Sequence, residues 1–482
     1  MVDVDLSCIT NPNYKPNLFD VHRILEQWIV GEHESRLAVF TNWILGQQNC
    51  MISGQRSSGK TFMVDNMCKL LSVKNGMYNL SAGSEKSAWY QVEKLKGHTY
   101  IVVSELNKLP KGMLEILKDW GEGKDSVYKT VVFESGQRRT QEFTLPRRPY
   151  IFCLADEEEM KIDDQLRSRL TVIRSDDSEA QNVNVLNKQA MLAMLPQSIK
   201  VVDTQTVDDL RLHLTTLPLF SKSNFIHPAA QVFVEAIPTT FTDCRRDFPK
   251  YLSNTYGITR FFWKKRINYV EEDKTTYLVT PEDMYYNHII YGNILKDSAL
   301  RCTNIEKKIL DIVQINEVLN RTQIQNKLRG AGLNISAHMV SRHLNILTDL
   351  GYTNSEKIGS QPANYRIGTL IKEFQFLIDW DKVIQTCKDN MTKYYPVHSQ
   401  EYIEKHCGDI IMVTNPYTGV EVNLRDIKPE KKIKPLQSIE QPLFQKNEDK
   451  QMIIEEEVIV SDEDILAEIE SDIANKQTNG LS

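Results

Sequence analysis

The stretch Gly54-Gln55-Arg56-Ser57-Ser58-Gly59-Lys60-Thr61 decides the fold of this chain. It fits the pattern G-x-x-x-x-G-K-[ST], which forms the phosphate-binding loop of nucleotide hydrolases. Gly54 and Gly59 lack a Cβ, so the backbone can turn tightly and approach a phosphate closely. The N–H groups of the loop, with Ser57 and Ser58 at its centre, are then expected to point at the anion.

The remaining fixed residues and the flanks agree with this interpretation. Lys60 is expected to reach the β- and γ-phosphates of ATP, and the Thr61 hydroxyl to bind Mg²⁺. Residues 50–53 are a short apolar run typical of a buried strand, and apolar residues then recur at helical spacing over residues 62–71. A strand before the loop and a helix after it are what the motif requires.

Composition places the chain among ordinary globular proteins. It has 482 residues, 41% of them hydrophobic and 25% charged, which suggests two to four domains. No apolar run reaches the length of a membrane span, and the N-terminus has no signal-peptide pattern. None of the eight cysteines forms C-x-x-C, so we expect a cytoplasmic, reducing location and no zinc site.

Charge is distributed unevenly along the chain. Residues 436–482 hold twelve acidic and three basic residues, a net charge of −9, so the remainder of the chain carries +3. The acidic tail is expected to be disordered and to offer a docking segment to a protein partner. A mildly basic body permits nucleic-acid binding without requiring it.

A second buried strand is predicted over residues 100–103, and it ends in Ser104-Glu105. In a parallel sheet its carboxyl end would lie beside the phosphates. Glu105 is the candidate base that polarises the attacking water, and the alternative is an acidic residue that ends a strand on the surface. Ser104 stands where an Asp usually supports Mg²⁺, and its hydroxyl could hold a metal-bound water.

Two β-rich runs, 128–133 and 140–145, flank the polar turn Glu-Ser-Gly-Gln and predict a hairpin. Arg138 and Arg139 lie just past the turn. For an isolated hairpin these arginines would be read as a solvated basic loop. Their position directly before the next buried strand favours contact with nucleic acid.

That next strand, residues 150–155, ends in Asp156, where a polar sensor of the γ-phosphate would stand. Its charge would oppose the γ-phosphate unless the carboxyl is protonated or paired. Further on, Arg169 is the candidate arginine finger that completes the site of a neighbouring subunit, with Arg167 as the fallback.

Five segments follow from these patterns. They are an ATPase core (1–175), a mainly helical lid (176–300) with a patterned helix expected to begin at Gly257, a winged helix-turn-helix (301–368), a small mixed segment (369–435) and the acidic tail (436–482). The winged helix is predicted from three helical stretches and a Gly/Pro-containing hairpin. Its last helix would bury Val340, Leu344 and Leu347 and direct Ser341 and Arg342 toward a DNA major groove. Docking to a protein is the alternative use of such a module.

The order of these motifs resembles an AAA+ ATPase, specifically the branch with a hairpin inserted before the sensor strand. With the winged helix added, the chain is similar to a minichromosome-maintenance (MCM) replicative helicase that lacks the large N-terminal domain. The resemblance implies an α/β parallel sheet with helices on both faces, ATP and Mg²⁺, DNA, and a homo-oligomeric ring. It also implies that Arg260 is the second sensor arginine, since Ile258-Thr259-Arg260 matches that motif. Ser104 and Asp156 depart from the family's Asp and Asn.

Three functions remain open at this point. The chain is expected to be a DNA helicase of a virus or mobile element, an origin-binding initiator or helicase loader, or a weakly hydrolysing scaffold switched by ATP. The hairpin favours the helicase, and the missing N-terminal domain favours the initiator or loader.

Overall fold

The computed structural model describes residues 15–71, 76–80, 95, 97–104, 106–134, 137–159, 162–194, 204–237, 244–300, 302–316, 318–357, 361–368 and 376–428. Three features predicted above fall outside these ranges: Glu105, the hairpin tip at 135–136 and the acidic tail.

A five-stranded parallel sheet forms the centre of the ATPase core, in the order β2-β3-β6-β1-β7. The strand before the phosphate loop is thus paired on both sides, as its fully buried apolar sequence predicts. Strand β6 lies between it and β3, the strand that Ser104 follows. The predicted α/β class is confirmed. The strands are β1 (Cys50–Gly54), β2 (Met77–Leu80), β3 (Tyr100–Val103), β6 (Tyr150–Ala155) and β7 (Thr171–Arg174).

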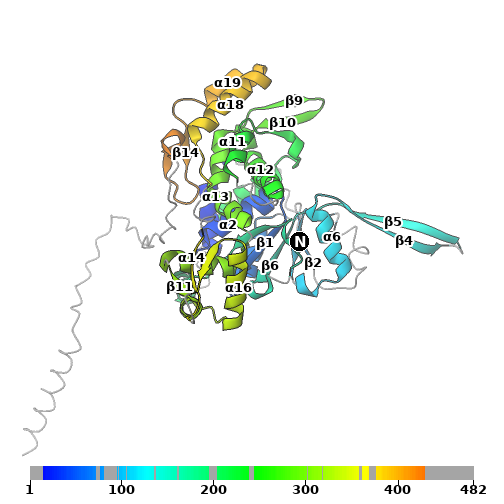
Figure 1. Cartoon of the computed structure of the whole chain (residues 1–482). Coiled ribbons are helices and arrows are strands. Elements are labelled where there is room, and N and C mark those ends of the chain that lie inside the picture. Colours follow the sequence, from blue (N-terminus) through cyan, green and yellow to red (C-terminus); the bar gives the residue numbers. More distant parts are fainter. Residues whose placement is uncertain are drawn as a thin grey trace, which may run out of the picture. The chain divides into compact units, whose positions relative to one another are not determined.

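Helices cover both faces of this sheet (Figure 1). One face packs against α1 (Leu18–Trp28), α2 (His33–Val39), the π-helix η2 (Phe40–Leu45) and α3 (Lys60–Cys68), and the other against α6 (Lys111–Gly121). Residues 35–45, in α2 and η2, are buried on every side. Helices α12 (Cys244–Phe261) and α13 (Pro281–Leu300) of the lid pack against them.

The lid contains α9 (Glu179–Met194), α10 (Thr204–Thr215), α11 (Ala230–Ala236), α12 (Cys244–Phe261) and α13 (Pro281–Leu300). The helix predicted to begin at Gly257 is wrong in its bounds, because Gly257 lies inside α12. A Cβ at Gly257 would come within 2.5 Å of the Gly46 backbone nitrogen, so this glycine allows α12 to approach the end of η2 closely. The lid also holds a small sheet that the sequence patterns missed, made of β8 (Phe225–Ile226), β9 (Asn268–Glu271) and β10 (Lys274–Leu278).

The predicted hairpin forms from β4 (Ser126–Glu134) and β5 (Gln137–Leu145), which pair along their whole length. Figure 1 shows this two-stranded ribbon extending well beyond α6. Its base is fixed by Ser126, whose hydroxyl donates to Asp119 on α6 at 2.6 Å, and by the buried Leu145. After β5 the chain continues into β6 of the central sheet, and only four residues separate the two strands.

Residues 302–368, called the winged-helix module after the prediction, form the three predicted helices and the predicted hairpin, β12 and β13. A short strand that was not predicted, β11, pairs with β13 and completes a three-stranded antiparallel sheet. Val340, Leu344 and Leu347 are all fully buried in its own hydrophobic core, as predicted. The elements are α14 (Asn304–Asn316), β11 (Leu319–Asn320), α15 (Arg321–Gly330), α16 (Ala337–Asp349), β12 (Thr353–Glu356) and β13 (Asn364–Ile367).

The C-terminal segment folds onto the lid. Trp380, Tyr402 and Leu424 join the same hydrophobic core as the lid and the N-terminal helices, and the Tyr402 hydroxyl donates to the Val279 carbonyl at 2.7 Å. It comprises α18 (Trp380–Tyr394), α19 (Pro396–His406), β14 (Met412–Thr414) and β15 (Glu421–Asn423). The remaining short helices are α7 (Asp156–Glu159), α8 (Asp164–Arg167), η4 (Leu106–Lys108), η5 (Lys222–Asn224), η6 (Trp263–Lys265) and η7 (Leu424–Asp426).

Candidate functional site

The phosphate loop connects β1 directly to α3, and its backbone has the conformation that the motif needs. Ser57 and Gly59 both have positive φ, 64° and 84°. A Cβ at Gly54 would lie 1.8 Å from the Ser175 Oγ, so a larger residue here would force the Ser175 side chain to turn away from the loop. Ser58 and Ser175 share a hydrogen bond of 2.9 Å, which ties the loop to the residue that follows β7.

Lys60 begins α3 and is only 8% exposed. Its ammonium donates to the carbonyls of Gly54, at 3.0 Å, and Gln55, and to the Ser58 hydroxyl at 3.2 Å. Burial lowers the pKa of Lys60, and the nearby thiol of Cys153 and carboxylate of Asp156 act against this shift. A buried cation held only by loop oxygens fits a site that accepts a phosphate.

The two candidate Mg²⁺ ligands follow β1 and β3 at the same edge of the sheet, with β6 between these two strands. Thr61 is exposed at the start of α3, and Ser104 is exposed at the end of β3, where its hydroxyl donates to Asn79. Among the described residues no group of three or more His, Cys, Asp or Glu side chains is arranged to hold a metal. The hydroxyl oxygens of Thr61 and Ser104 suit an ion that keeps most of its waters and arrives with a triphosphate, as Mg²⁺ usually does.

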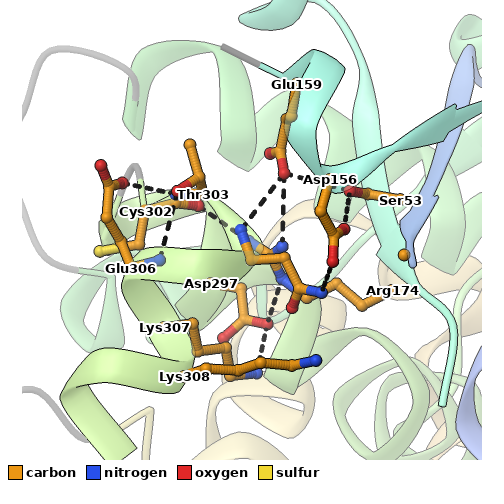
Figure 2. Close-up of polar contacts among 12 residues, drawn as sticks. Ser53, Asp156, Glu159, Arg174, Asp297, Cys302, Thr303, Glu306, Lys307 and Lys308 are labelled. Carbon is orange, nitrogen blue, oxygen red and sulfur yellow. Dashed lines mark hydrogen bonds and ion pairs between the residues drawn. The ribbon is translucent and has the colours of Figure 1, made fainter. Parts of the chain in front are cut away.

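Asp156 lies at the carboxyl end of β6 and is 3% exposed (Figure 2). It is paired: Ser53 donates to one carboxylate oxygen at 3.1 Å, and the Asn304 amide donates to the other at 2.7 Å. Burial raises the pKa of Asp156, while these two hydrogen bonds lower it. The Asp156 carboxylate at the sensor position therefore has one hydrogen-bond donor from β1 and one from the winged-helix module, and these offset part of its negative charge.

Glu159, which the sequence patterns did not single out, is fully buried beside Asp156. It accepts from Ser53 at 3.1 Å and from the Asn304 backbone N–H at 3.2 Å, and it pairs with Arg167 at 2.9 Å and Arg174 at 3.7 Å. The run Asp156-Glu157-Glu158-Glu159 looks like a solvated acidic turn. The three-residue spacing on a helix was the available signal, since it places Asp156 and Glu159 on one face.

Both candidate finger arginines have partners within their own chain. Arg169 pairs with Glu122 and donates to the Lys118 carbonyl at 3.3 Å. Arg167 is held by Glu159 and donates to the Cys302 carbonyl at 3.2 Å. Arg167 pairs with Glu159 beside Asp156, whereas Arg169 pairs with Glu122. Arg169 therefore remains the predicted finger.

The placement of Arg260 requires a correction. Its guanidinium donates to the carbonyls of Pro218 and of Leu45, the latter at 3.3 Å, and bonds the Tyr100 hydroxyl. Leu45 precedes β1 and Tyr100 begins β3, so Arg260 lies at the amino edge of the parallel sheet. The phosphate loop leaves the opposite edge, about 13 Å away over the five residues of β1. Arg260 therefore braces the lid against the sheet and does not face a γ-phosphate bound to the same chain.

The candidate nucleic-acid residues lie on two separate elements. Arg138 and Arg139 are on β5, where their backbones pair with Phe133 and Val132, and their side chains are outside the described part of the chain. On α16, Arg342 is exposed and the half-buried Ser341 accepts from Arg321 at 3.2 Å. Arg321 is an exposed basic residue of α15, and the same helix carries two more, Lys327 and Arg329.

Comparisons with known proteins add little to this geometry. No protein-family model matches the sequence, and no curated protein matches it. Among solved structures, the chain is similar to one named "a putative ATPase from Cytophaga hutchinsonii", with 13% identity, 57% of this chain and 86% of that chain covered, and a TM-score of 0.33. A likeness at this level carries no argument about function. None of the helices that the structure describes has both the length and the apolar composition of a bilayer span.

Proposed function

We propose that this chain is a Mg²⁺-dependent AAA+ ATPase that works on DNA as a ring-forming motor, as MCM-like replicative helicases do. The observation that carries the proposal is the convergence of the phosphate loop, Ser104 and Asp156 at one edge of the sheet, with a long hairpin entering that sheet through the sensor strand. A change at the sensor position can therefore be transmitted to the hairpin through β6.

Each residue at the edge has a task in hydrolysis. The backbone of Gly54, Ser57, Ser58 and Gly59 cradles the phosphates, and Lys60 leaves the loop carbonyls to bind them. Mg²⁺, held with the triphosphate near Thr61 and Ser104, would neutralise charge that develops during phosphoryl transfer. Glu105 is assigned the role of base.

Two surfaces are assigned to DNA. The hairpin, through Arg138 and Arg139, is proposed to grip phosphates in the channel of a ring, which is a sequence-independent contact. The α16 face with Ser341 and Arg342 is proposed to contact duplex DNA, and the exposed basic residues of α15 favour this over a protein partner. The acidic tail is proposed to dock on a protein partner.

An initiator or loader is the second candidate. It is favoured by the docking of the winged-helix module on the sensor position, because that contact lets the nucleotide state control a DNA-reading helix. A weakly hydrolysing scaffold is the third, and it rests on the absence of the usual Asp and Asn at Ser104 and Asp156.

Two assays run together separate the three. A motor hydrolyses ATP and displaces a strand, an initiator or loader hydrolyses ATP without displacing one, and a scaffold binds ATP with little turnover. Glu105→Gln should retain ATP and slow its hydrolysis, and equal turnover in the wild type would remove Glu105 from the role of base.

A further inference from the structure

The first turn of the winged-helix module is buried against the sensor position of the ATPase core. Asn304 is 5% exposed and makes two contacts there: its amide donates to Asp156 at 2.7 Å, and its backbone N–H donates to Glu159 at 3.2 Å. Ser53, which precedes Gly54 of the phosphate loop, donates to both carboxylates. One residue of the module therefore contacts the carboxylate at the sensor position.

Ion pairs beside it reinforce the contact of Asn304 with the carboxylates of Asp156 and Glu159 (Figure 2). Arg167 and Arg174 each pair with Glu159 and donate to the Cys302 carbonyl, at 3.2 and 2.8 Å, which fixes the chain just before α14. Lys308 on α14 pairs with Asp177, which follows β7. These ion pairs bring the start of α14 to the carboxyl edge of the sheet and hold it there.

The same turn is connected to the DNA-reading helix. Thr303 and Glu306 form a capping box, in which each backbone N–H donates to the side chain of the other, at 2.7 and 3.3 Å. The second carboxylate oxygen of Glu306 contacts Nδ1 of the fully buried His343 on α16, at 3.0 Å. A shift of Asn304 would therefore displace the helix that carries Arg342.

We propose that Asn304 is a positioning residue of the nucleotide site: by donating to Asp156 it orients that carboxylate and offsets part of its negative potential at a bound γ-phosphate, so that ATP binding and docking of the winged-helix module favour each other. The inference rests on the proposed ATPase function. The carboxylate stands where an AAA+ sensor has an amide, and Asn304 supplies an amide at that carboxylate. Coupling between binding events is reciprocal, so a module that assists ATP must be held more firmly by ATP.

The test uses nucleotide affinity in the full-length chain, measured with fluorescent ATP and ADP analogues. Asn304→Ala should weaken ATP binding about tenfold, the size expected when a hydrogen bond to a charged group is lost, and leave ADP binding nearly unchanged. Asn316→Ala is the matched control, because Asn316 ends the same helix and its side-chain amide donates to the Ile312 carbonyl, at 2.6 Å. It should change neither affinity.

Rescue separates positioning from a folding defect. Asp156→Asn in the Asn304→Ala background removes the unpaired charge and should restore most of the ATP affinity, whereas a general loss of structure would not be repaired. Hydrogen exchange over residues 302–310 should slow when an ATP analogue binds the wild type and stay unchanged in Asn304→Ala.

Three results would overturn the role of Asn304: equal losses of ATP and ADP affinity in Asn304→Ala, no loss of affinity, or failure of the rescue. None of them would contradict the proposed ATPase function. Failure of the proposed function has another signature: the wild type would bind neither nucleotide, or Lys60→Ala would bind both as well as the wild type.

Discussion

Lys60 is the residue on which nucleotide binding depends most. It is the loop's buried cation, and its ammonium is held by loop oxygens that a phosphate can replace. Lys60→Ala should weaken ATP binding about 10- to 100-fold, the range of one or two hydrogen bonds to a charged group. Lys69→Ala is the control, because Lys69 is exposed at the other end of α3 and pairs with Asn66. Similar titration curves for the two variants would contradict the loop assignment.

Glu32 gives a pH-dependent prediction at the same scale. It is 4% exposed and burial raises its pKa to about 7, while the Ser35 hydroxyl and the Asp176 N–H, 3.1 Å from both carboxylate oxygens, lower it. The neighbouring carboxylates of Asp176 and Asp177 raise it further. Because the folded state holds its proton more tightly than the unfolded state, the stability from Glu32 is present below about pH 4.5 and is lost as pH rises through about 7.

Replacing Glu32 with Gln removes this titration. Between pH 5 and pH 8 the wild type should lose about 3 kcal/mol of unfolding free energy relative to Glu32→Gln. Denaturant titrations of both proteins across this range measure the difference in unfolding free energy. The buried histidines are the same in both proteins, so their contribution to the pH dependence cancels. Parallel curves would show that Glu32 is ionised throughout.

At the scale of elements, the motor proposal depends most on the hairpin β4–β5. The ribbon is anchored at its base and extends beyond α6 (Figure 1), so changes near its tip should leave the core intact. Arg138→Ala with Arg139→Ala is expected to keep the fold and basal ATPase activity and to lose stimulation by DNA and strand displacement. The slope of log K against log salt for single-stranded DNA should become shallower by about 1.4, which is roughly 0.7 for each arginine removed.

A control for this variant removes the same charge elsewhere. Lys393 and Lys405 are exposed on α18 and α19, and their joint replacement by Ala should alter neither unwinding nor the salt slope. If strand displacement survives the arginine substitutions, the initiator or loader becomes the favoured function.

At the scale of the whole molecule, the ring is tested by complementation. A finger acts on the neighbouring subunit, so Arg169→Ala should lower ATPase activity several-fold without abolishing ATP binding. Mixed with Lys60→Ala subunits it should recover part of that activity, because some interfaces then combine an intact loop with an intact arginine. Full-rate hydrolysis by a monomer in sedimentation would contradict the finger, and activity lost equally in Glu122→Ala would assign Arg169 a structural role through its pair with Glu122.

The sequence by itself determined the phosphate loop, the strands around it, the hairpin and the three helices of the winged-helix module. These features are encoded locally, in glycine positions, apolar runs and helical periodicity, so neighbouring residues suffice to reveal them. Tertiary structure alone decided that Arg260 lies at the amino edge of the sheet, that residues 35–45 are buried on all sides and that residues 376–428 join the lid. It also decided the pairing of Asp156 with Asn304, 148 residues apart. A single sequence does not show which distant side chain compensates a buried charge, because that choice depends on how the modules pack.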